Sequence, residues 1–221
     1  MLSSQPVSVA NLPESVIDGK LIRSKISTPL GSMIAVADDS ALRLLEFENR
    51  VALTGELRRL ESESGLVGLG RNTITETLAS ELRHYFAGES AAFQIPTTQH
   101  GTAFEEAVWD ALKQIPHGQT RSYGQIAEML GQPEKSREVG RANGANKISI
   151  IVPCHRVIGA DGSLVGYGGG LWRKKWLLDH ERQHAWAAFE HGKPASPVSL
   201  LSESQVQPRL SEQHHRRGGS E

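Results

Sequence analysis

The chain has 221 residues, 38% hydrophobic and 22% charged, which is enough for one large domain or two small ones with hydrophobic cores. The net charge of −1 disfavours a strongly basic nucleic-acid binder, and no segment has the run of about 20 apolar residues that a membrane-spanning helix needs. Residues 1–15 lack the layout of a signal peptide, so we expect a cytoplasmic protein, associated with the nucleoid if the source is bacterial.

The first half of the chain has the pattern of a small sheet. Residues 1–17 carry two prolines and scattered serines without periodicity, and we expect a flexible arm there. Apolar segments separated by turn residues then predict three antiparallel strands, over 21–27, 33–37 and 41–47. Apolar residues at helical spacing predict an amphipathic helix over 72–87 that covers this sheet. Residues 18–95 are therefore expected to form an N-terminal α/β domain.

A connection between domains is expected over 89–101, which contains proline and glycine and has no helical period. A second domain is then predicted over 99–182. Residues 102–105 match a capping box, and the apolar stripe after them indicates a helix that ends near Pro116.

Two shorter helices follow in the pattern. Residues 122–125 match a second capping box, and Pro133 suits the first turn of a further helix that runs to about Asn143. Two short helices joined by a glycine-containing turn are typical of a helix-turn-helix, although an ordinary helical hairpin has the same pattern.

The last part of the pattern contains the one cysteine. An apolar run over 148–152 predicts a buried strand or extended segment that leads to Cys154 and His155. A glycine-rich loop comes next, and helical spacing resumes over 171–181. Polar residues and glycine dominate 183–221, where we expect a disordered tail. The predicted fold class is thus α/β (α+β): a small antiparallel sheet covered by a helix, then a mostly helical domain with a helix-turn-helix and the cysteine.

A single cysteine excludes an intramolecular disulfide and a cysteine-rich zinc site, so Cys154 is either a buried small side chain or a reactive thiol. A thiol attacks only as thiolate. Successive side chains of an extended segment point to opposite faces, so a direct bond from Cys154 to His155 is not expected, and a bridging water would carry the proton. His155 would need a carboxylate to hold its tautomer, and spacing leaves Asp179 and Glu181 as equal candidates.

The segment Pro153-Cys154-His155-Arg156-Val157 resembles the active-site motif of the O6-alkylguanine-DNA alkyltransferases, also called methylated-DNA–protein-cysteine methyltransferases. Further landmarks of that family follow its order and spacing: Gly101-Thr102-Ala103-Phe104, Val108-Trp109, Ile115-Pro116, Ser122-Tyr123, Arg137, Gly144-Ala145-Asn146, Gly166-Tyr167 and Leu177-Leu178. The resemblance is strong over 99–182 and looser over 20–95.

The resemblance implies DNA repair without a cofactor or metal, by irreversible, single-turnover transfer of an alkyl group from O6 of guanine, with O4 of thymine as a second candidate. It implies that Cys154 accepts the alkyl group, that His155 draws its proton through a water, and that Glu181 orients His155. Tyr123 would donate toward N3 of the flipped guanine, so that the base leaves in neutral form.

The implied partner is double-stranded DNA bound through its minor groove by a monomeric protein, with no membrane. Arg137 would enter the duplex in place of the extruded nucleotide; without the resemblance it is an ordinary solvated arginine. Asn146 would tie the helix pair to the active-site segment. The other implied DNA contacts are Ser136, Gly140 and Arg141. The implied base pocket consists of Val157, Tyr167, Gly168 and Ser149.

The local charge, and two positions that differ from the family pattern, limit what the resemblance implies. Residues 117–156 carry six basic and three acidic side chains, a local charge of +3, so we expect weak, sequence-tolerant and salt-sensitive DNA binding. Glu138 stands where the family usually has alanine and would oppose phosphate unless it pairs with Arg141 or Lys135. Ser149 stands where some members have a proline, so the tolerance for bulky alkyl groups does not follow.

Three other functions fit parts of the pattern. A non-enzymatic alkyltransferase-like protein would bind damaged guanine without repairing it, but those relatives replace the cysteine that is present here as Cys154. A helix-turn-helix regulator would need a polar, base-reading helix face, which Gly140 and Ala142 do not supply. A cysteine hydrolase would need a histidine from elsewhere in the chain.

Overall fold

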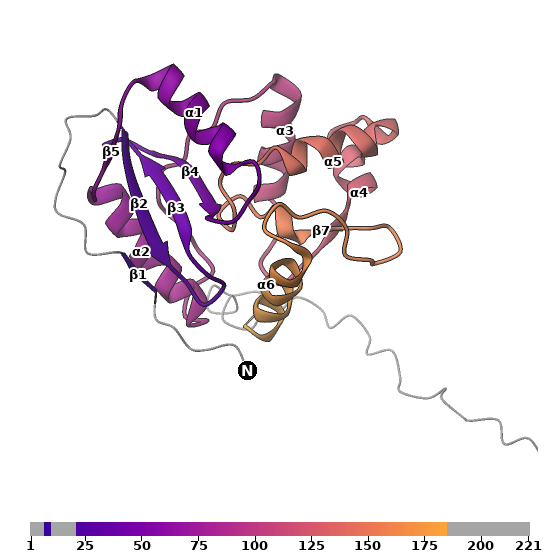
Figure 1. Ribbon diagram of the computed structural model, residues 1–221. Coiled ribbons are helices and arrows are strands. Elements are labelled where there is room, and N and C mark those ends of the chain that lie inside the picture. The colour runs from indigo at the N-terminus through magenta and orange to yellow at the C-terminus, as the bar shows by residue number, and fades with distance from the viewer. Residues whose placement is uncertain (1–6, 10–20, 185–221) are drawn as a thin grey trace, which may run out of the picture. The chain divides into compact units, whose positions relative to one another are not determined.

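The computed structural model describes residues 7–9 and 21–184, and these begin with a five-stranded sheet and two helices (Figure 1). The strands are β1 (Ser8–Val9), β2 (Leu21–Ser27), β3 (Met33–Ala37), β4 (Leu42–Phe47) and β5 (Val67–Leu69). The helices are α1 (Leu53–Ser64) and α2 (Thr73–Phe86). Strands β1 to β4 pair antiparallel in chain order, and β5 pairs parallel with β2 on the edge that β1 also occupies.

Each face of the sheet is covered by one helix because successive strand side chains point to opposite faces. Met33, Ala35 and Ala37 pack in one core cluster with Leu78 and Leu82 of α2. The alternate residues of the same strand, Ile34 and Val36, belong to a second cluster that contains Leu53 of α1. The predicted strands and the predicted helix over 72–87 are confirmed.

Three elements of this part were not predicted: α1, β5 and β1. Helix α1 contains Gly55 and begins without a side-chain cap, and strand β5 has only three residues, so neither leaves a strong local pattern. In the segment expected as an arm, Ser8–Val9 pairs with β2 and Val7 is buried, so this part of the segment is held to the sheet. The rest of residues 1–17 lies outside the described residues.

The second part is mostly helical, as predicted. Its elements are α3 (Ala103–Lys113), β6 (Arg121–Ser122), α4 (Tyr123–Met129), the 3₁₀ turn η1 (Pro133–Lys135), α5 (Ser136–Gly144), the 3₁₀ turn η2 (Cys154–Arg156), β7 (Val157–Ile158) and α6 (Leu171–Gln183). Both predicted capping boxes are present, at Thr102 with Glu105 and at Ser122 with Gln125. The helix expected from Pro133 begins as η1 and becomes α5. Beyond residue 184 the expected tail lies outside the described residues.

The segment before the cysteine differs from the prediction. Residues 148–152 form turns and not an extended strand, and Ile150 has a positive φ of 74°. Asn146 explains the difference, because its side chain accepts from Ile148 N (3.0 Å) and donates to Val152 O (2.9 Å). These two hydrogen bonds bend the backbone around the side-chain amide of Asn146. They take the place of the backbone hydrogen bonds that a strand would form with a neighbouring strand. The apolar side chains are still buried, as the pattern predicted.

The sheet and the helical part meet along β4. Leu42 forms a bridge with Thr97, in the connection, and Leu45 forms one with Ile148, just before the segment that contains Cys154. One core cluster contains residues of α2, α3, α5 and the cysteine segment. Strand β4 therefore positions the segment that leads to Cys154. The division into domains over 18–95 and 99–182 stays a prediction, and none of the described helices is long and apolar enough to cross a bilayer.

Candidate active site

Cys154 opens η2 and lies in the wall of a cavity of about 200 Å³. Residues from the sheet, from α4 and α5, and from the glycine-rich loop surround it. They are Glu46, Arg50, Tyr123, Gly140, Asn143, Gly144, Asn146, Ser149, Cys154, Gly166, Tyr167 and Gly168. The structure thus brings together, around one thiol, most of the predicted pocket residues. Val157 is the exception: it is buried on β7 and does not line this cavity.

The thiol of Cys154 is 6% exposed, and burial raises its pKa to about 11, although a hydrogen bond with Asn146 works in the other direction. The backbone of the cysteine is held from α5, where Asn143 Nδ2 donates to Cys154 O (3.3 Å). At neutral pH the resting side chain is therefore a protonated thiol. Attack on a substrate requires a base that takes this proton.

His155 has the geometry of such a base. Its Nε2 lies 2.8 Å from Glu181 Oε1, and both side chains are fully buried. Because an ionised carboxylate only accepts hydrogen bonds, Nε2 must carry the proton, which leaves Nδ1 as the acceptor. This Nδ1 is buried and has no partner within residues 7–9 and 21–184. Burial lowers the pKa of His155, so the ring is neutral and can receive a proton.

Glu181 is held by four groups besides His155. Arg156 donates to both carboxylate oxygens, with Nε to Oε2 at 2.8 Å and Nη2 to Oε1 at 2.9 Å. Tyr85 Oη donates to Oε1 (2.9 Å) and Gly118 N to Oε2 (3.1 Å). Burial works to raise the pKa of Glu181, but its charged and hydrogen-bonded partners hold that pKa well below its usual range. Asp179, the other candidate, faces outward and pairs with Lys175 at 2.6 Å.

Tyr123 and the glycine-rich loop form the side of the cavity away from the sheet. Tyr123 Oη donates to Val165 O (3.2 Å), and burial together with the nearby thiol raises the pKa of this tyrosine. The hydroxyl of Tyr167 is buried without a partner in the described part of the chain. Gly168 lies against Arg50, since a Cβ on it would come within 2.7 Å of Arg50 Nε. The loop therefore leaves polar groups available to a bound base.

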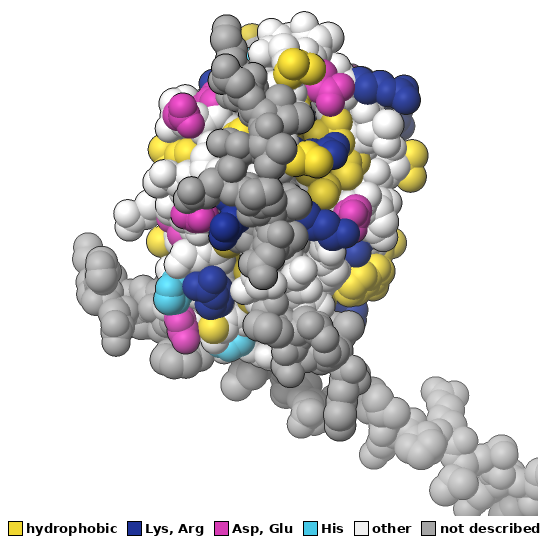
Figure 2. Space-filling model, turned by 60° about the vertical axis from the view of Figure 1, so that its left-hand side comes forward, with side chains coloured by type: hydrophobic (Ala, Val, Ile, Leu, Met, Phe, Trp, Pro, Cys, Tyr) yellow, Lys and Arg dark blue, Asp and Glu magenta, His cyan; other side chains and the backbone are white. Residues whose placement is uncertain are grey.

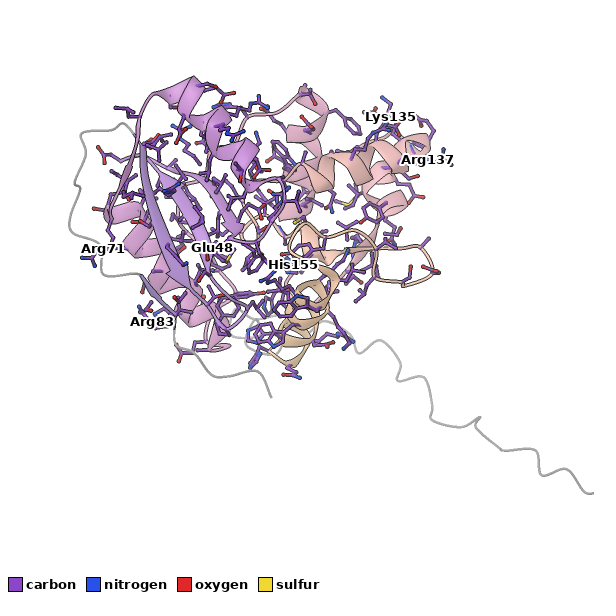
Figure 3. All side chains as sticks on the ribbon, in the orientation of Figure 1. Glu48, Arg71, Arg83, Lys135, Arg137 and His155 are labelled. Atoms are coloured by element: carbon purple, nitrogen blue, oxygen red, sulfur yellow. The ribbon has the colours of Figure 1, made fainter. Side chains whose placement is uncertain are left out.

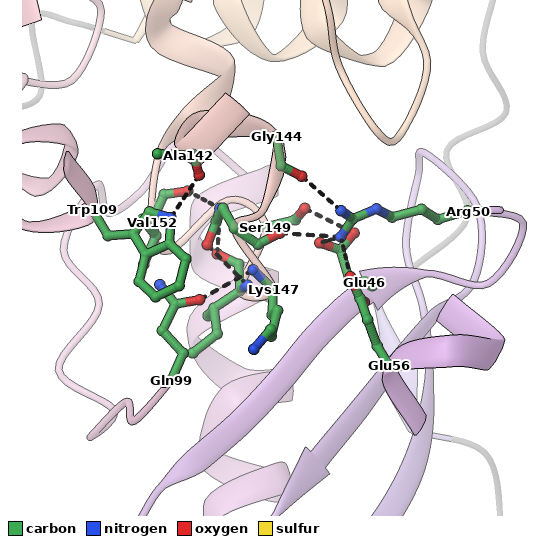
Figure 4. A network of polar contacts seen from close by, with 12 residues as sticks. Glu46, Arg50, Glu56, Gln99, Trp109, Ala142, Gly144, Lys147, Ser149 and Val152 are labelled. Atoms are coloured by element: carbon green, nitrogen blue, oxygen red, sulfur yellow. Dashed lines mark hydrogen bonds and ion pairs between the residues drawn. The ribbon is translucent and has the colours of Figure 1, made fainter. Parts of the chain in front are cut away.

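Glu46 and Arg50 line the cavity although the sequence pattern did not select them (Figure 4). Glu46 pairs with Arg50 and accepts from Ser149 Oγ (3.0 Å). Arg50 also donates to Asn146 O (3.0 Å) and to Gly144 O (2.9 Å), at the carboxyl end of α5. One signal was available: Glu46 is a charged residue inside the apolar strand β4. The sheet therefore contributes a polar wall to the cavity.

Four of the predicted DNA contacts, Ser136, Arg137, Gly140 and Arg141, lie along α5. Ser136 is its first residue, Arg137 is exposed, and Gly140 lies near the ring of Tyr123. Figure 3 shows Arg137 at the outer end of the helix pair and His155 deep inside the molecule. Glu138 pairs with Arg141 at 3.2 Å, so its charge is partly neutralised, as DNA binding would require. Arg137 forms no ion pair with any residue of the described segments.

The local charge of +3 counted over residues 117–156 overstates the positive charge that is exposed and could contact DNA. Arg156, counted as one of the six basic residues, is buried in its pair with Glu181. The face turned forward in Figure 2 is the side of the sheet, where Lys and Arg side chains lie among Asp and Glu side chains; the helix pair with α5 lies on the side turned away. The exposed cations of α5 are therefore the main candidates for phosphate contacts.

Comparison with protein families identifies relatives for both parts. The model described as "6-O-methylguanine DNA methyltransferase, ribonuclease-like domain" matches residues 21–99. The model described as "6-O-methylguanine DNA methyltransferase, DNA binding domain" matches residues 103–183, so the two matches together cover more than half of the chain. The chain belongs to the 6-O-methylguanine DNA methyltransferase family. The resemblance stated from the sequence is thereby confirmed.

Members of the 6-O-methylguanine DNA methyltransferase family match over most of their own length. The methylated-DNA–protein-cysteine methyltransferase of Shigella flexneri is 45% identical over 166 residues, which are 73% of this chain and 96% of the relative. That of Mycolicibacterium paratuberculosis is 48% identical over 154 residues, 68% of this chain and 93% of the relative. A crystal structure of Mycobacterium tuberculosis OGT in complex with DNA matches with a TM-score of 0.63 and 39% identity, over 74% of this chain and 93% of that one. The predicted fold class is confirmed.

Proposed function

We propose that this chain repairs DNA by moving an alkyl group from O6 of guanine to the sulfur of Cys154. The observation that carries the proposal is a thiol in a cavity wall followed directly in the chain by a buried histidine: Nδ1 of His155 is an acceptor without a partner in the described residues, and Glu181 holds Nε2 of the same ring. Relatives named methylated-DNA–protein-cysteine methyltransferase, at 45% and 48% identity, support the chemistry. The relative crystallised with DNA supports DNA as the partner.

In this proposal His155 and Glu181 handle the thiol proton, and Cys154 accepts the alkyl group. A water between Sγ and Nδ1 carries the thiol proton to His155, and Glu181 stabilises the imidazolium that results. The Cys154 thiolate then attacks the alkyl carbon: the S–C bond forms, the C–O6 bond breaks, and its electron pair stays on the base. Over the whole reaction the thiol proton replaces the alkyl group, so the base leaves as neutral guanine.

Tyr123 assists the leaving base in this proposal. Its raised pKa keeps the hydroxyl protonated, and the hydroxyl opens onto the cavity, where it bonds only to Val165 O. Donation to N3 of guanine would exchange that backbone acceptor for the base. Such a hydrogen bond strengthens as negative charge develops on the base, which lowers the barrier for departure.

The base must leave the duplex before it reaches the cavity, because O6 is stacked inside DNA. In this proposal Arg137 contacts DNA and fills the space of the extruded nucleotide, and Ser136, Gly140 and Arg141 of the same helix, α5, contact DNA beside it. We propose that the protein acts as a monomer on the minor groove. Its location in the cytoplasm, or in a bacterial nucleoid, is likewise proposed.

A mass measurement tests the proposed function. The protein is incubated with a duplex that contains one O6-methylguanine, and an unmodified duplex serves as the control. We expect the protein to gain one methyl group, mapped to the peptide with Cys154, only with the methylated duplex. A protein that binds the methylated duplex and keeps its original mass would be a damage-binding protein and not a transferase.

Replacing Arg137 by alanine tests the DNA side separately. We expect repair of duplex DNA to slow about ten- to a hundredfold, because flipping a nucleotide costs a few kcal/mol that the side chain no longer offsets. Reaction with free O6-benzylguanine, which needs no flipping, should change little. Arg83→Ala, an exposed arginine on α2, is the matched control. Equal losses on both substrates would show that Arg137 acts on the chemistry and not on extrusion.

A further inference from the structure

Lys174 of α6 is a completely buried lysine next to the cavity. Its ammonium donates to Val165 O (2.6 Å) and to Gly166 O (3.3 Å), in the glycine-rich loop. Within residues 7–9 and 21–184 no carboxylate forms an ion pair with it. A buried charge that meets only carbonyl dipoles is costly, because they repay less of its lost hydration than an opposite charge would.

The other buried cations near the site are compensated differently. Arg156 pairs with Glu181, and Arg50 pairs with Glu46. Arg173 lies over the ring of Phe47, with its guanidinium carbon 4.2 Å from the ring centre. Among the described residues, no carboxylate pairs with Lys174 and no aromatic ring lies against its ammonium. Its charge is therefore available to an anion that forms only during the reaction.

The ammonium binds the loop that forms part of the cavity wall. Gly166, whose carbonyl it binds, lines the cavity together with Cys154 and Tyr123. Tyr123 Oη and the ammonium share the acceptor Val165 O, at 3.2 Å and 2.6 Å. Burial lowers the pKa of Lys174 to about 8, and the nearby Cys154 works against that change. At neutral pH the side chain is thus still mainly cationic.

The remaining charged and titratable groups around the thiol do not supply a free positive charge. They are Glu46, Arg50, Tyr123 and Tyr167, with His155, Arg156 and Glu181 on the side of α6. Glu46 and Arg50 oppose each other in one ion pair, and the two tyrosines are neutral because their pKa values are raised. This holds for the resting site. When His155 takes the thiol proton it becomes an imidazolium, and His155, Arg156 and Glu181 together then carry one net positive charge. Lys174 adds a second positive charge, bound to the carbonyls of the glycine-rich loop.

We propose that Lys174 is a positioning residue whose buried ammonium stabilises the Cys154 thiolate as it forms. The inference rests on the proposed function, in which this thiolate is the nucleophile. The thiol proton moves to His155 and leaves a negative charge on sulfur, in the cavity whose wall includes the loop that the ammonium binds. Alkylation turns the thiolate into a neutral thioether, so the attraction ends with the reaction. The carbonyl contacts keep the ammonium in place before and after this step.

The reaction of Cys154 with iodoacetamide over a range of pH tests this role without DNA. The chain has one cysteine, so a single added carbamidomethyl group in the mass spectrum reports this thiol alone. Lys174→Gln retains hydrogen-bond donors for the loop carbonyls but removes the charge. We expect it to slow the reaction about tenfold at pH 7, where Lys174 is mainly cationic in the wild type, and we expect the difference to shrink above pH 8, where Lys174 loses its proton. Lys174→Arg, which keeps the charge, should restore most of the rate.

Lys175→Gln is the matched control, because Lys175 is the next residue, is exposed and pairs with Asp179. It should leave the pH profile unchanged. Thermal melts identify variants that do not fold, and Lys174→Met, which keeps the straight aliphatic stem, replaces Lys174→Gln if that variant fails. A folded uncharged variant with the wild-type pH profile would overturn the inference. Because iodoacetamide needs no DNA, this result is independent of whether the protein repairs O6-methylguanine.

Discussion

Replacing Cys154 by serine is expected to abolish alkyl transfer while DNA binding remains. A hydroxyl is far harder to ionise than a thiol, and the buried site that already raises the thiol pKa to about 11 would oppose an alkoxide still more. The two side chains are similar in size, so the contacts of Asn143 and Asn146 around the segment should persist. Transfer is measured as methyl groups on the protein, and binding as retention of a methylated duplex.

The result separates chemistry from recognition. A serine variant that still removes the methyl group would show that another residue accepts it or that water does. A variant that no longer binds the methylated duplex would show that the thiol contributes to recognition. A thermal melt close to that of the wild type serves as the control for folding.

Glu181→Gln is expected to have the second large effect, on both stability and repair. Five donor groups converge on this buried carboxylate, and a glutamine would replace one accepting oxygen by a donating NH₂ group. Breaking a buried ion pair at one partner costs about 3–5 kcal/mol, here because Arg156 loses its counter-charge. We also expect slower transfer, since His155 would lose the group that fixes its tautomer.

Urea unfolding at pH 7 and a repair assay measure these two effects, and Asp179→Asn on the exposed side of the same helix is the control. The pH dependence has a definite sign. The folded pKa of Glu181 lies below its unfolded value, so its contribution is complete above about pH 5 and is lost as pH falls. The difference in stability between wild type and Glu181→Gln should therefore shrink in acid. A difference that grows as pH falls would contradict this assignment.

The helix starts could be predicted from the sequence because the interactions that fix them are local. At Thr102 and Ser122 a side chain three residues later completes the capping box, so both residues of the contact lie within four consecutive positions of the sequence. The strands β2 to β4 are equally local, since turn residues separate their apolar segments. Helix α1 was missed because Gly55 and an uncapped start weaken its pattern.

The site was predictable only in part. Cys154 and His155 came from a motif, whereas Glu181 came only from the family resemblance, since the residues alone left Asp179 as an equal candidate. In the structure Glu181 contacts His155 and Asp179 pairs with Lys175. Glu46 reaches Ser149 across 103 positions, a contact that no local pattern contains. The prediction of an extended segment over 148–152 was wrong for another reason. A buried apolar run has the same sequence pattern in a strand and in a turn, and here the hydrogen bonds of the Asn146 side chain determine the backbone path.

The most direct test of the central claim is the number of guanines that one protein molecule restores. The thioether formed on Cys154 has no acidic proton, and the chain has no second cysteine to regenerate the first. With methylated duplex in large excess, restored guanine should rise to a plateau of one per protein molecule, however long the incubation. Continued release of guanine beyond one equivalent, with the protein unmodified at Cys154, would contradict alkyl transfer to this residue.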